Sequence, residues 1–169
     1  MSTTIVRPSL KYLPHYIAAL ERGWSANTMN PAAASEELAR IRVAPDAFLA
    51  SLEDREARGV PVRRPDGSMV PRLPGFRRWI WDGDFCGSIG LRWLPGSDTL
   101  PDYVLGHIGY AVVPWKQQQG HATRALAAML KEAREIGLRS VEIVTIPENT
   151  ASQRVITANG GTLVEQFEK

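Results

Sequence analysis

The stretch that decides the fold is HIGYAVVPWKQQQGHATRALAAML, residues 107–130. Residues 107–113 are mostly apolar and include β-branched side chains, which predicts a strand that ends at Pro114. From His121 the apolar residues recur at helical spacing, at i, i+3, i+4, i+7, i+8 and i+11: Ala122, Ala125, Leu126, Met129, Leu130 and Ala133. We therefore expect an amphipathic helix that ends at Gly137, joined to the strand by a glutamine-rich turn.

This turn has the features of an anion-binding site. The first N–H groups of a helix lack partners within the helix, and the helix dipole adds partial positive charge there. Gly120 would let a phosphate touch the backbone, Ala122 keeps the next position small, and glutamine amides add uncharged donors. Alone, the pattern is weak, because about one chain in six of this length would contain it or a close variant by chance. Neither a Walker P-loop nor a GxGxxG motif occurs in the sequence.

The remaining segments predict a single α/β domain that spans residues 1–169. Besides 107–113, strands are expected at 3–7, 76–83, 84–94, 141–147 and 162–169. Helices are expected at 13–23, 36–41, 45–59 and 149–161, in addition to the one that begins at His121. The segment 59–75 is rich in proline and glycine and predicts a long loop or a loose hairpin. The order is an antiparallel meander followed by a βαβαβ unit.

Composition excludes several classes of protein. With 169 residues and 44% apolar composition, the chain can bury one core of its own. The formal charge of +2 gives no electrostatic case for nucleic acid or an anionic membrane as partner, although a small anionic ligand is compatible with it. Cys86 is the single cysteine, so it is expected to be a buried thiol, and no metal site is expected. No signal peptide or apolar stretch of about 20 residues occurs, so a cytoplasmic protein is expected.

Residues 107–130 together with IPENTASQRVITANGG (146–161) resemble the Gcn5-related N-acetyltransferase (GNAT) superfamily. The resemblance is closest to the branch of ribosomal-protein alanine acetyltransferases and predicted acetyltransferases, and it is specific from about 76 to 165. It implies an α/β fold with a mixed, mostly antiparallel sheet flanked by helices. In this fold the fourth and fifth strands splay apart to hold acetyl-CoA.

The resemblance also implies roles for particular residues. Asn149 would contact the pantetheine arm, and Ser152 would lie near the thiol. The backbone of Ala111, Val112 and Val113 would pair with the arm and the acetyl carbonyl. A larger set would wrap the pyrophosphate: Gln117, Gln118, Gln119, Gly120, His121, Ala122 and Thr123.

Two departures from the family pattern stand out. Many members carry a tyrosine seven residues after the asparagine to protonate the leaving thiolate, but Ile156 stands there, so Ser152 or water would have to serve. The family also usually ends in two antiparallel strands, and only 162–169 is a candidate here. The last strand could come from another molecule, as in a homodimer, have been removed, or be absent.

The implied reaction is attack by an amine on the thioester, which needs a base for the amine's proton. His107 is the first choice, because it opens the fourth strand and has an ordinary pKa of about 6.5. Glu142, across the splay, is the alternative base. The expected function is acetyl transfer from acetyl-CoA to a primary amine of a small molecule or peptide. The acceptor class stays open, with Trp24, Asp82 and Asp84 as candidate contacts. The alternative function is a non-catalytic CoA-binding or sensing module.

Overall fold

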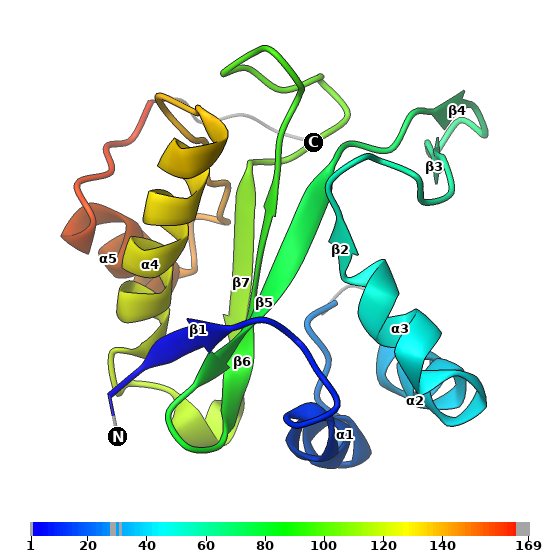
Figure 1. Ribbon diagram of the computed structural model, residues 1–169. Helices are drawn as coiled ribbons and strands as arrows, with labels where there is room; N and C mark the ends of the chain where they lie inside the picture. Colours follow the sequence, from blue (N-terminus) through cyan, green and yellow to red (C-terminus); the bar gives the residue numbers. More distant parts are fainter. Residues whose placement is uncertain (1, 28–29, 31, 165–169) are drawn as a thin grey trace.

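The computed structural model describes residues 2–27, 30 and 32–164. Its centre is a five-stranded antiparallel sheet (Figure 1). Strands β5 (Gly75–Trp81), β6 (Phe85–Arg92) and β7 (Ile108–Val112) form the expected meander. On its other edge, β5 pairs with β1 (Thr4–Val6) and β2 (Glu53–Asp54). The strands predicted at 3–7, 76–83, 84–94 and 107–113 are confirmed.

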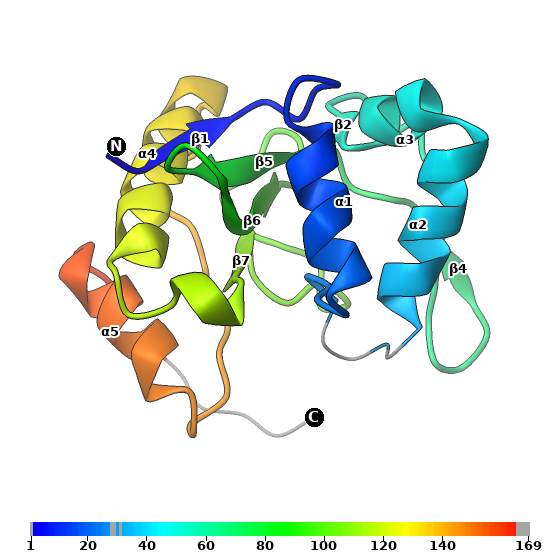
Figure 2. The same ribbon diagram turned by 90° about the horizontal axis from the view of Figure 1, so that it is seen from below.

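Helices cover both faces of the sheet (Figure 2). On one face lie α4 (His121–Ile136) and α5 (Thr150–Ala158); the other carries α1 (Leu13–Glu21), α2 (Ala33–Val43) and α3 (Pro45–Ser51). Alternation along β5 builds two cores, because Ile80 packs toward Met129 of α4 while Trp79 packs toward Tyr16 of α1. The predicted α/β class, a sheet flanked by helices, is confirmed.

The third helix is shorter than the predicted span 45–59. It ends at Ser51, and Glu53 then pairs with Phe76 as part of β2. Glu53 also accepts a hydrogen bond at 2.7 Å from Arg78, which is 8% exposed. These interactions come from a strand distant in sequence, so helical periodicity alone could not end the helix correctly. The following segment is a hairpin of β3 (Val62–Arg63) and β4 (Met69–Val70).

The strand predicted at 141–147 is wrong as regular structure. Residues 141–146 keep a strand-like alternation of partly buried and exposed side chains, but no ladder joins them to β7. Residues 162–164 are not a strand either, and 165–169 lie outside the described residues. Within the described part of the chain, the only helices formed are too short or too polar to cross a membrane.

Candidate active site

The glutamine-rich turn predicted from the sequence connects β7 to α4. A short 3-10 helix, η1 (Pro114–Lys116), begins it, and Gly120 is the N-cap of α4 with φ +80°. Gln118 also has a positive φ of +62°. Left-handed backbone at a non-glycine residue is uncommon, so the loop is held in a specific shape. The N-terminus of α4, a helix of 16 residues, directly follows this loop, whose residues 117–120 are exposed.

Arg124 folds back over this loop, which the sequence pattern did not predict. Its Nη2 donates to the carbonyl oxygen of Gln119 at 2.6 Å, and its Nε donates to Thr3 Oγ1 at 2.8 Å. A β-carbon at Gly120 would lie 2.6 Å from Arg124 Nη1. A guanidinium thus stands at the positive end of the helix dipole, where a cation is unfavourable unless an anion joins it.

Asp82, in the turn between β5 and β6, links the two ends of the loop. Its carboxylate oxygens accept hydrogen bonds from Lys116 Nζ at 3.0 and 3.2 Å, and one of them lies 3.5 Å from Nε2 of the buried His121. Burial alone would raise the pKa of Asp82, but hydrogen bonds from Lys116 and Cys86 outweigh burial and lower it. Both aspartates expected to contact a substrate amine thus have partners within the chain: Asp82 binds Lys116, and Asp84 Oδ1 lies 2.7 Å from His15 Nδ1.

Asp82, Cys86 and His121 also bring three metal-ligand atoms within 4.8 Å of one another. Lys116 already neutralises the carboxylate, and burial with the Asp82 charge beside it raises the pKa of the Cys86 thiol to about 12. A metal ion would need that thiol deprotonated and would have to displace the ammonium. The chemistry of this donor set favours a hydrogen-bonded support for the loop over a metal centre.

Among the described residues, no strand pairs with the edge of β7 that faces away from β6, and we call this edge open. Hydrogen-bonded and non-hydrogen-bonded pairs alternate along an antiparallel ladder. Val113 donates its N–H to the carbonyl of Cys86 at 2.9 Å, so the next pair, Val112 with Gly87, is non-hydrogen-bonded. Val112 and, by the same alternation, Tyr110 therefore point their backbone groups to the open edge. Gln117 Nε2 donates to the Val112 carbonyl at 3.2 Å, as this orientation requires.

The same alternation separates the three residues expected to pair with a ligand. Ala111 stands opposite Ser88 in a pair of the hydrogen-bonded kind, so its backbone faces β6. Val113 donates to Cys86, and its carbonyl accepts from Lys116 N–H at 3.0 Å. Of the three, Val112 alone presents backbone groups to the open edge.

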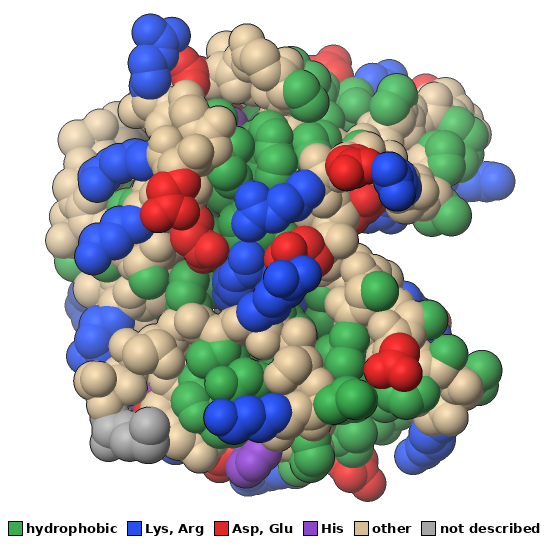
Figure 3. All heavy atoms as spheres, in the orientation of Figure 1, with side chains coloured by type: hydrophobic (Ala, Val, Ile, Leu, Met, Phe, Trp, Pro, Cys, Tyr) green, Lys and Arg blue, Asp and Glu red, His purple; other side chains and the backbone are tan. Residues whose placement is uncertain are grey.

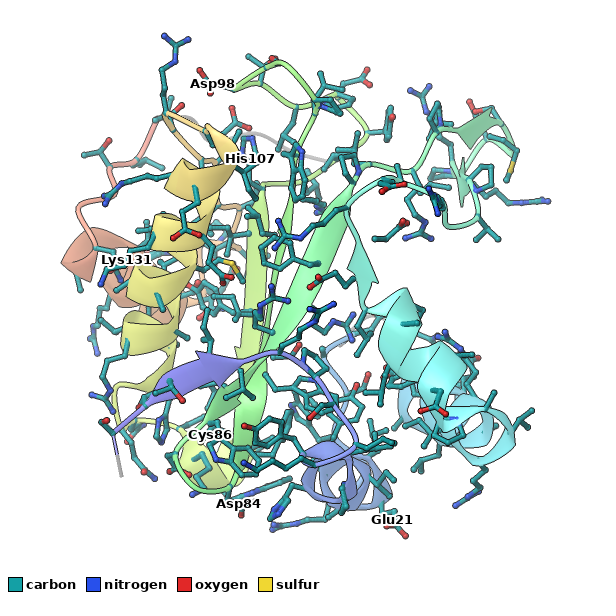
Figure 4. All side chains as sticks on the ribbon, in the orientation of Figure 1. Glu21, Asp84, Cys86, Asp98, His107 and Lys131 are labelled. Carbon is teal, nitrogen blue, oxygen red and sulfur yellow. The ribbon has the colours of Figure 1, made fainter. Side chains whose placement is uncertain are left out.

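His107 joins β7 to the segment that follows α4. Its N–H donates to the Glu142 carbonyl at 2.7 Å, and its Nδ1 accepts the Glu142 N–H at 2.9 Å. The imidazole is 1% exposed, and burial lowers its pKa against the opposite effect of the Glu142 and Asp98 carboxylates. Figure 4 shows His107 and Cys86 at opposite ends of the sheet. β7 and the segment 141–146 thus meet at His107, and no ladder joins them from there toward the glutamine loop. We call the region between these two segments the wedge and His107 its apex.

The bonding of His107 bears on its predicted role as a base. Nδ1 accepts a backbone N–H, so a neutral ring carries its proton on Nε2, which is buried without a partner among the described residues. No lone pair is left to take a proton. The Glu142 side chain, by contrast, is exposed in the alternation of 141–146.

The N-terminus of α5 lies across the wedge from β7. Asn149 is its N-cap, and Oδ1 accepts the Ser152 N–H at 3.0 Å. Ser152 Oγ lies 2.7 Å from the hydroxyl of Tyr110. Asn159 near the end of α5 donates to the carbonyl of Thr123 in α4 at 3.2 Å, which ties both helices together. Tyr110 was missed by the sequence analysis, because its partner is 42 residues away.

A separate open hollow of about 500 Å³ lies between the end of β1, α3 and β2 (Figure 3). Its central charge, Glu53, is already paired with Arg7 at 3.0 Å and Arg78 at 2.7 Å. None of the loop, edge or α5 residues lines it. We therefore place the candidate site at the wedge. Trp24, the aromatic residue expected on the acceptor side, packs edge-on against Phe85 in the core.

Comparisons with known proteins identify the family and the fold of the chain. The family model for the acetyltransferase (GNAT) domain matches residues 27–162, and the chain belongs to this family of acetyltransferases. Among curated proteins, no sequence matches significantly.

Three solved structures share the fold at 15–19% identity. The aminoglycoside N-acetyltransferase AAC(6')-Iy, solved with a bisubstrate analog, is 19% identical with a TM-score of 0.58 over 100% of this chain and 97% of that chain. The ribosomal-protein alpha-N-acetyltransferase RimL, solved with coenzyme A, is 16% identical with a TM-score of 0.56 over 94% and 79%. The self-immunity acetyltransferase MccE, solved with acetyl-CoA and AMP, is 15% identical with a TM-score of 0.52 over 94% and 77%.

Proposed function

We propose that this chain is an N-acetyltransferase that moves the acetyl group of acetyl-CoA to a primary amine of a small molecule or peptide. The observation that carries the proposal is the open edge of β7, which leads through η1 and the glutamine loop to the exposed start of α4. Family membership supports the acetyl transfer. The structures solved with acetyl-CoA or coenzyme A support the choice of donor.

The glutamine loop would hold the pyrophosphate of acetyl-CoA. A phosphate at the N-terminus of α4 would meet its free N–H groups and the guanidinium of Arg124. Gly120 leaves the backbone there without a side chain, and a β-carbon at this position would press on Arg124. The exposed amides of Gln118 and Gln119 add donors. His121 is buried, so it would contribute its backbone, while Ala122 and Thr123 continue the first turn.

The pantetheine arm would extend the sheet at the open edge of β7. Val112 would exchange backbone hydrogen bonds with the arm, as a further strand would. Gln117 would give up the Val112 carbonyl and turn to the ligand. Asn149 uses Oδ1 for its cap, which leaves the Nδ2 group to donate to the arm.

The thioester would then lie near the apex of the wedge, where an amine can reach it. We assign the amine's proton to Glu142, whose carboxylate is exposed beside the apex, in place of His107. Ser152 would face the sulfur that leaves. In this assignment His107 is structural, because both its backbone N–H and its ring hold Glu142 in place.

Calorimetric titration of acetyl-CoA tests the donor site. We expect micromolar binding, which corresponds to about 8 kcal/mol, and its loss in Gly120→Glu, which places a carboxylate in the phosphate site. Gly137→Glu is the matched control, because Gly137 has φ +103° at the other end of α4. Absence of binding by the parent would refute the proposal.

A panel of amines then tests the transfer itself. We expect acetylated product with at least one class among peptide N-termini, amino acids, polyamines and amino sugars. We also expect a loss of kcat in Glu142→Gln, because a general base contributes roughly 10²–10⁴-fold. Binding of acetyl-CoA without any turnover would favour the CoA-sensing module instead.

A further inference from the structure

The phenol of Tyr110 and the hydroxyl of Ser152 form a contact that the proposed reaction has not yet used. Their oxygens lie 2.7 Å apart, and the phenol O–H also donates to the Ser152 carbonyl at 3.3 Å. Tyr110 belongs to β7 and Ser152 to the first turn of α5, so the contact spans the wedge between the two elements. Both side chains are partly buried, and no charged group contributes to the pKa of Tyr110.

Either hydroxyl can donate in the shorter of these two contacts, and acidity favours the phenol as the donor. A phenol has an ordinary pKa of about 10 and is far more acidic than an alkyl hydroxyl, so Tyr110 is the better donor. When Tyr110 donates to Ser152 Oγ, the proton of Ser152 is free to point elsewhere. Without this bond, a serine in a helix often turns its hydroxyl back to its own backbone. Tyr110 therefore prepares Ser152 as a donor.

The open edge shows where the Tyr110–Ser152 pair lies along the proposed ligand path. Gln117 bonds the Val112 carbonyl, so the phosphate end of the site adjoins Val112. Tyr110 is the next residue whose backbone faces the edge, two residues nearer the apex at His107. An extended arm from the phosphate loop passes Val112 first and reaches the level of Tyr110 about 7 Å later. The Tyr110–Ser152 pair thus lies between Val112, which the arm passes first, and the apex at His107.

Chemistry at this level of the wedge needs a hydrogen-bond donor. Aminolysis of a thioester forms a C–N bond and breaks the C–S bond, and the electron pair of the C–S bond goes to sulfur. The amine's proton leaves to Glu142, as proposed above, and the sulfur departs as a thiolate that takes a proton from water on release. A positioned donor stabilises charge that develops in the transition state.

We propose that Ser152 donates this hydrogen bond to the leaving sulfur and that Tyr110 is the positioning residue that aims it. The inference rests on the proposed function, since it requires acetyl-CoA along the β7 edge. It also explains how the chain functions with Ile156. Residues 152 and 156 lie one turn apart on the same face of α5. The phenol of Tyr110 therefore reaches the helix face from which a tyrosine at position 156 would extend.

The test compares the parent with Tyr110→Phe, which removes one oxygen atom. Coenzyme A binding is measured by calorimetry, and the thiol pKa of bound coenzyme A by the ultraviolet absorbance of the thiolate. We expect unchanged binding of coenzyme A, a pKa of the bound thiol about one unit higher, and a kcat lower by about tenfold with unchanged KM, since one pKa unit is 1.36 kcal/mol. Ser152→Ala should raise the pKa of the thiol at least as much.

Two controls make the result specific. Tyr103→Phe removes another phenol, whose O–H donates to the carbonyl of Pro71 at 3.2 Å and does not contact α5. This variant should change neither the thiol pKa of bound coenzyme A nor kcat. In the Tyr110→Phe background, Ile156→Tyr should recover part of the lost kcat, whereas Ile156→Phe should not, because the two differ only by the hydroxyl.

Unchanged kcat and thiol pKa in a Tyr110→Phe protein that binds coenzyme A would overturn the inference and leave the proposed function intact. Failure of the parent to bind coenzyme A would overturn both.

Discussion

The ammonium of Lys116 lies 3.0 Å from Oδ2 of Asp82, and the same carboxylate oxygen lies 3.5 Å from Nε2 of His121. Lys116 precedes the glutamine loop and His121 follows it. One side chain in the β5–β6 turn therefore fixes the distance between the two ends of the loop.

The first prediction concerns this carboxylate. Asp82→Asn should weaken acetyl-CoA binding about tenfold, or 1.4 kcal/mol, because the loop ends are no longer held by a charge. The free energy of unfolding should fall by about 1 kcal/mol, a value discounted for a partly exposed pair. Calorimetry and urea unfolding measure the two effects. Asp98→Asn, which breaks the exposed pair with Arg139, should leave binding unchanged; equal loss in both variants would contradict the prediction.

The second prediction separates backbone strain from the ligand site. Gly120→Ala and Gly137→Ala both force a left-handed conformation on alanine, at φ +80° and +103° at the two ends of α4. Each should cost about 1–2 kcal/mol of stability. Only Gly120→Ala should raise the Kd for acetyl-CoA, because its β-carbon would press on Arg124. An unchanged Kd in a folded Gly120→Ala protein would show that phosphates bind elsewhere.

The third prediction concerns His107 as a structural group. His107→Asn places an amide oxygen near the position of Nδ1, so the bond to Glu142 N–H can persist. Turnover should be retained, whereas removal of a true general base would cost roughly 10²–10⁴-fold. Such a loss, with the fold intact, would restore His107 as the base.

The fourth prediction is the pH dependence of stability that His107 confers. Its pKa is lowered in the folded state, so the unfolded state binds more protons as pH falls through about 6.5. Stability should therefore be full above pH 6.5 and decrease from there down to the folded pKa. His121 shifts in the same direction, so the loss should be smaller, but still present, in His107→Asn. Urea unfolding across this range measures it, and an identical loss in both proteins would refute the assignment.

The fifth prediction divides the two functions of the Asn149 amide. Asn149→Asp keeps an oxygen to cap Ser152 N–H, so stability should hold, but it loses the Nδ2 donor and should bind acetyl-CoA more weakly. Asn149→Ala should lose the cap as well, at a cost of about 1 kcal/mol. Thermal unfolding and calorimetry separate the effects. Equal affinity in the parent and Asn149→Asp would show that Nδ2 does not face the arm.

Local patterns predicted those parts of the fold that local forces determine. The helical spacing from Ala122 to Ala133 and the glycines at 120 and 137 gave the bounds of α4, since periodicity and caps act within a few residues. The 141–147 segment has the alternation of a strand, yet whether it forms a ladder depends on its partner. His107 binds Glu142 and the segments then separate, which no property of either segment alone could indicate.

The candidate site divides in the same way. The sequence placed Gly120 and Asn149 at the start of two helices, where the structure has both. Arg124 and Tyr110 escaped notice as site residues, and Asp82 was expected as an amine contact and not as a support of the loop, because each acts through a contact that only the folded chain creates. A partial signal existed for Arg124, a cation in the first turn of a helix, where charge of that sign is normally disfavoured.

The open edge of β7 has a further consequence, for solubility. A strand edge with unpaired backbone groups is a template on which other chains aggregate, and proteins usually cover or charge such edges. Here the neighbouring segment instead exposes Val144 and Ile146, at 41% and 64%. A ligand that extends the sheet along this edge would act as its cover, so the protein should be least prone to aggregate when its donor is abundant.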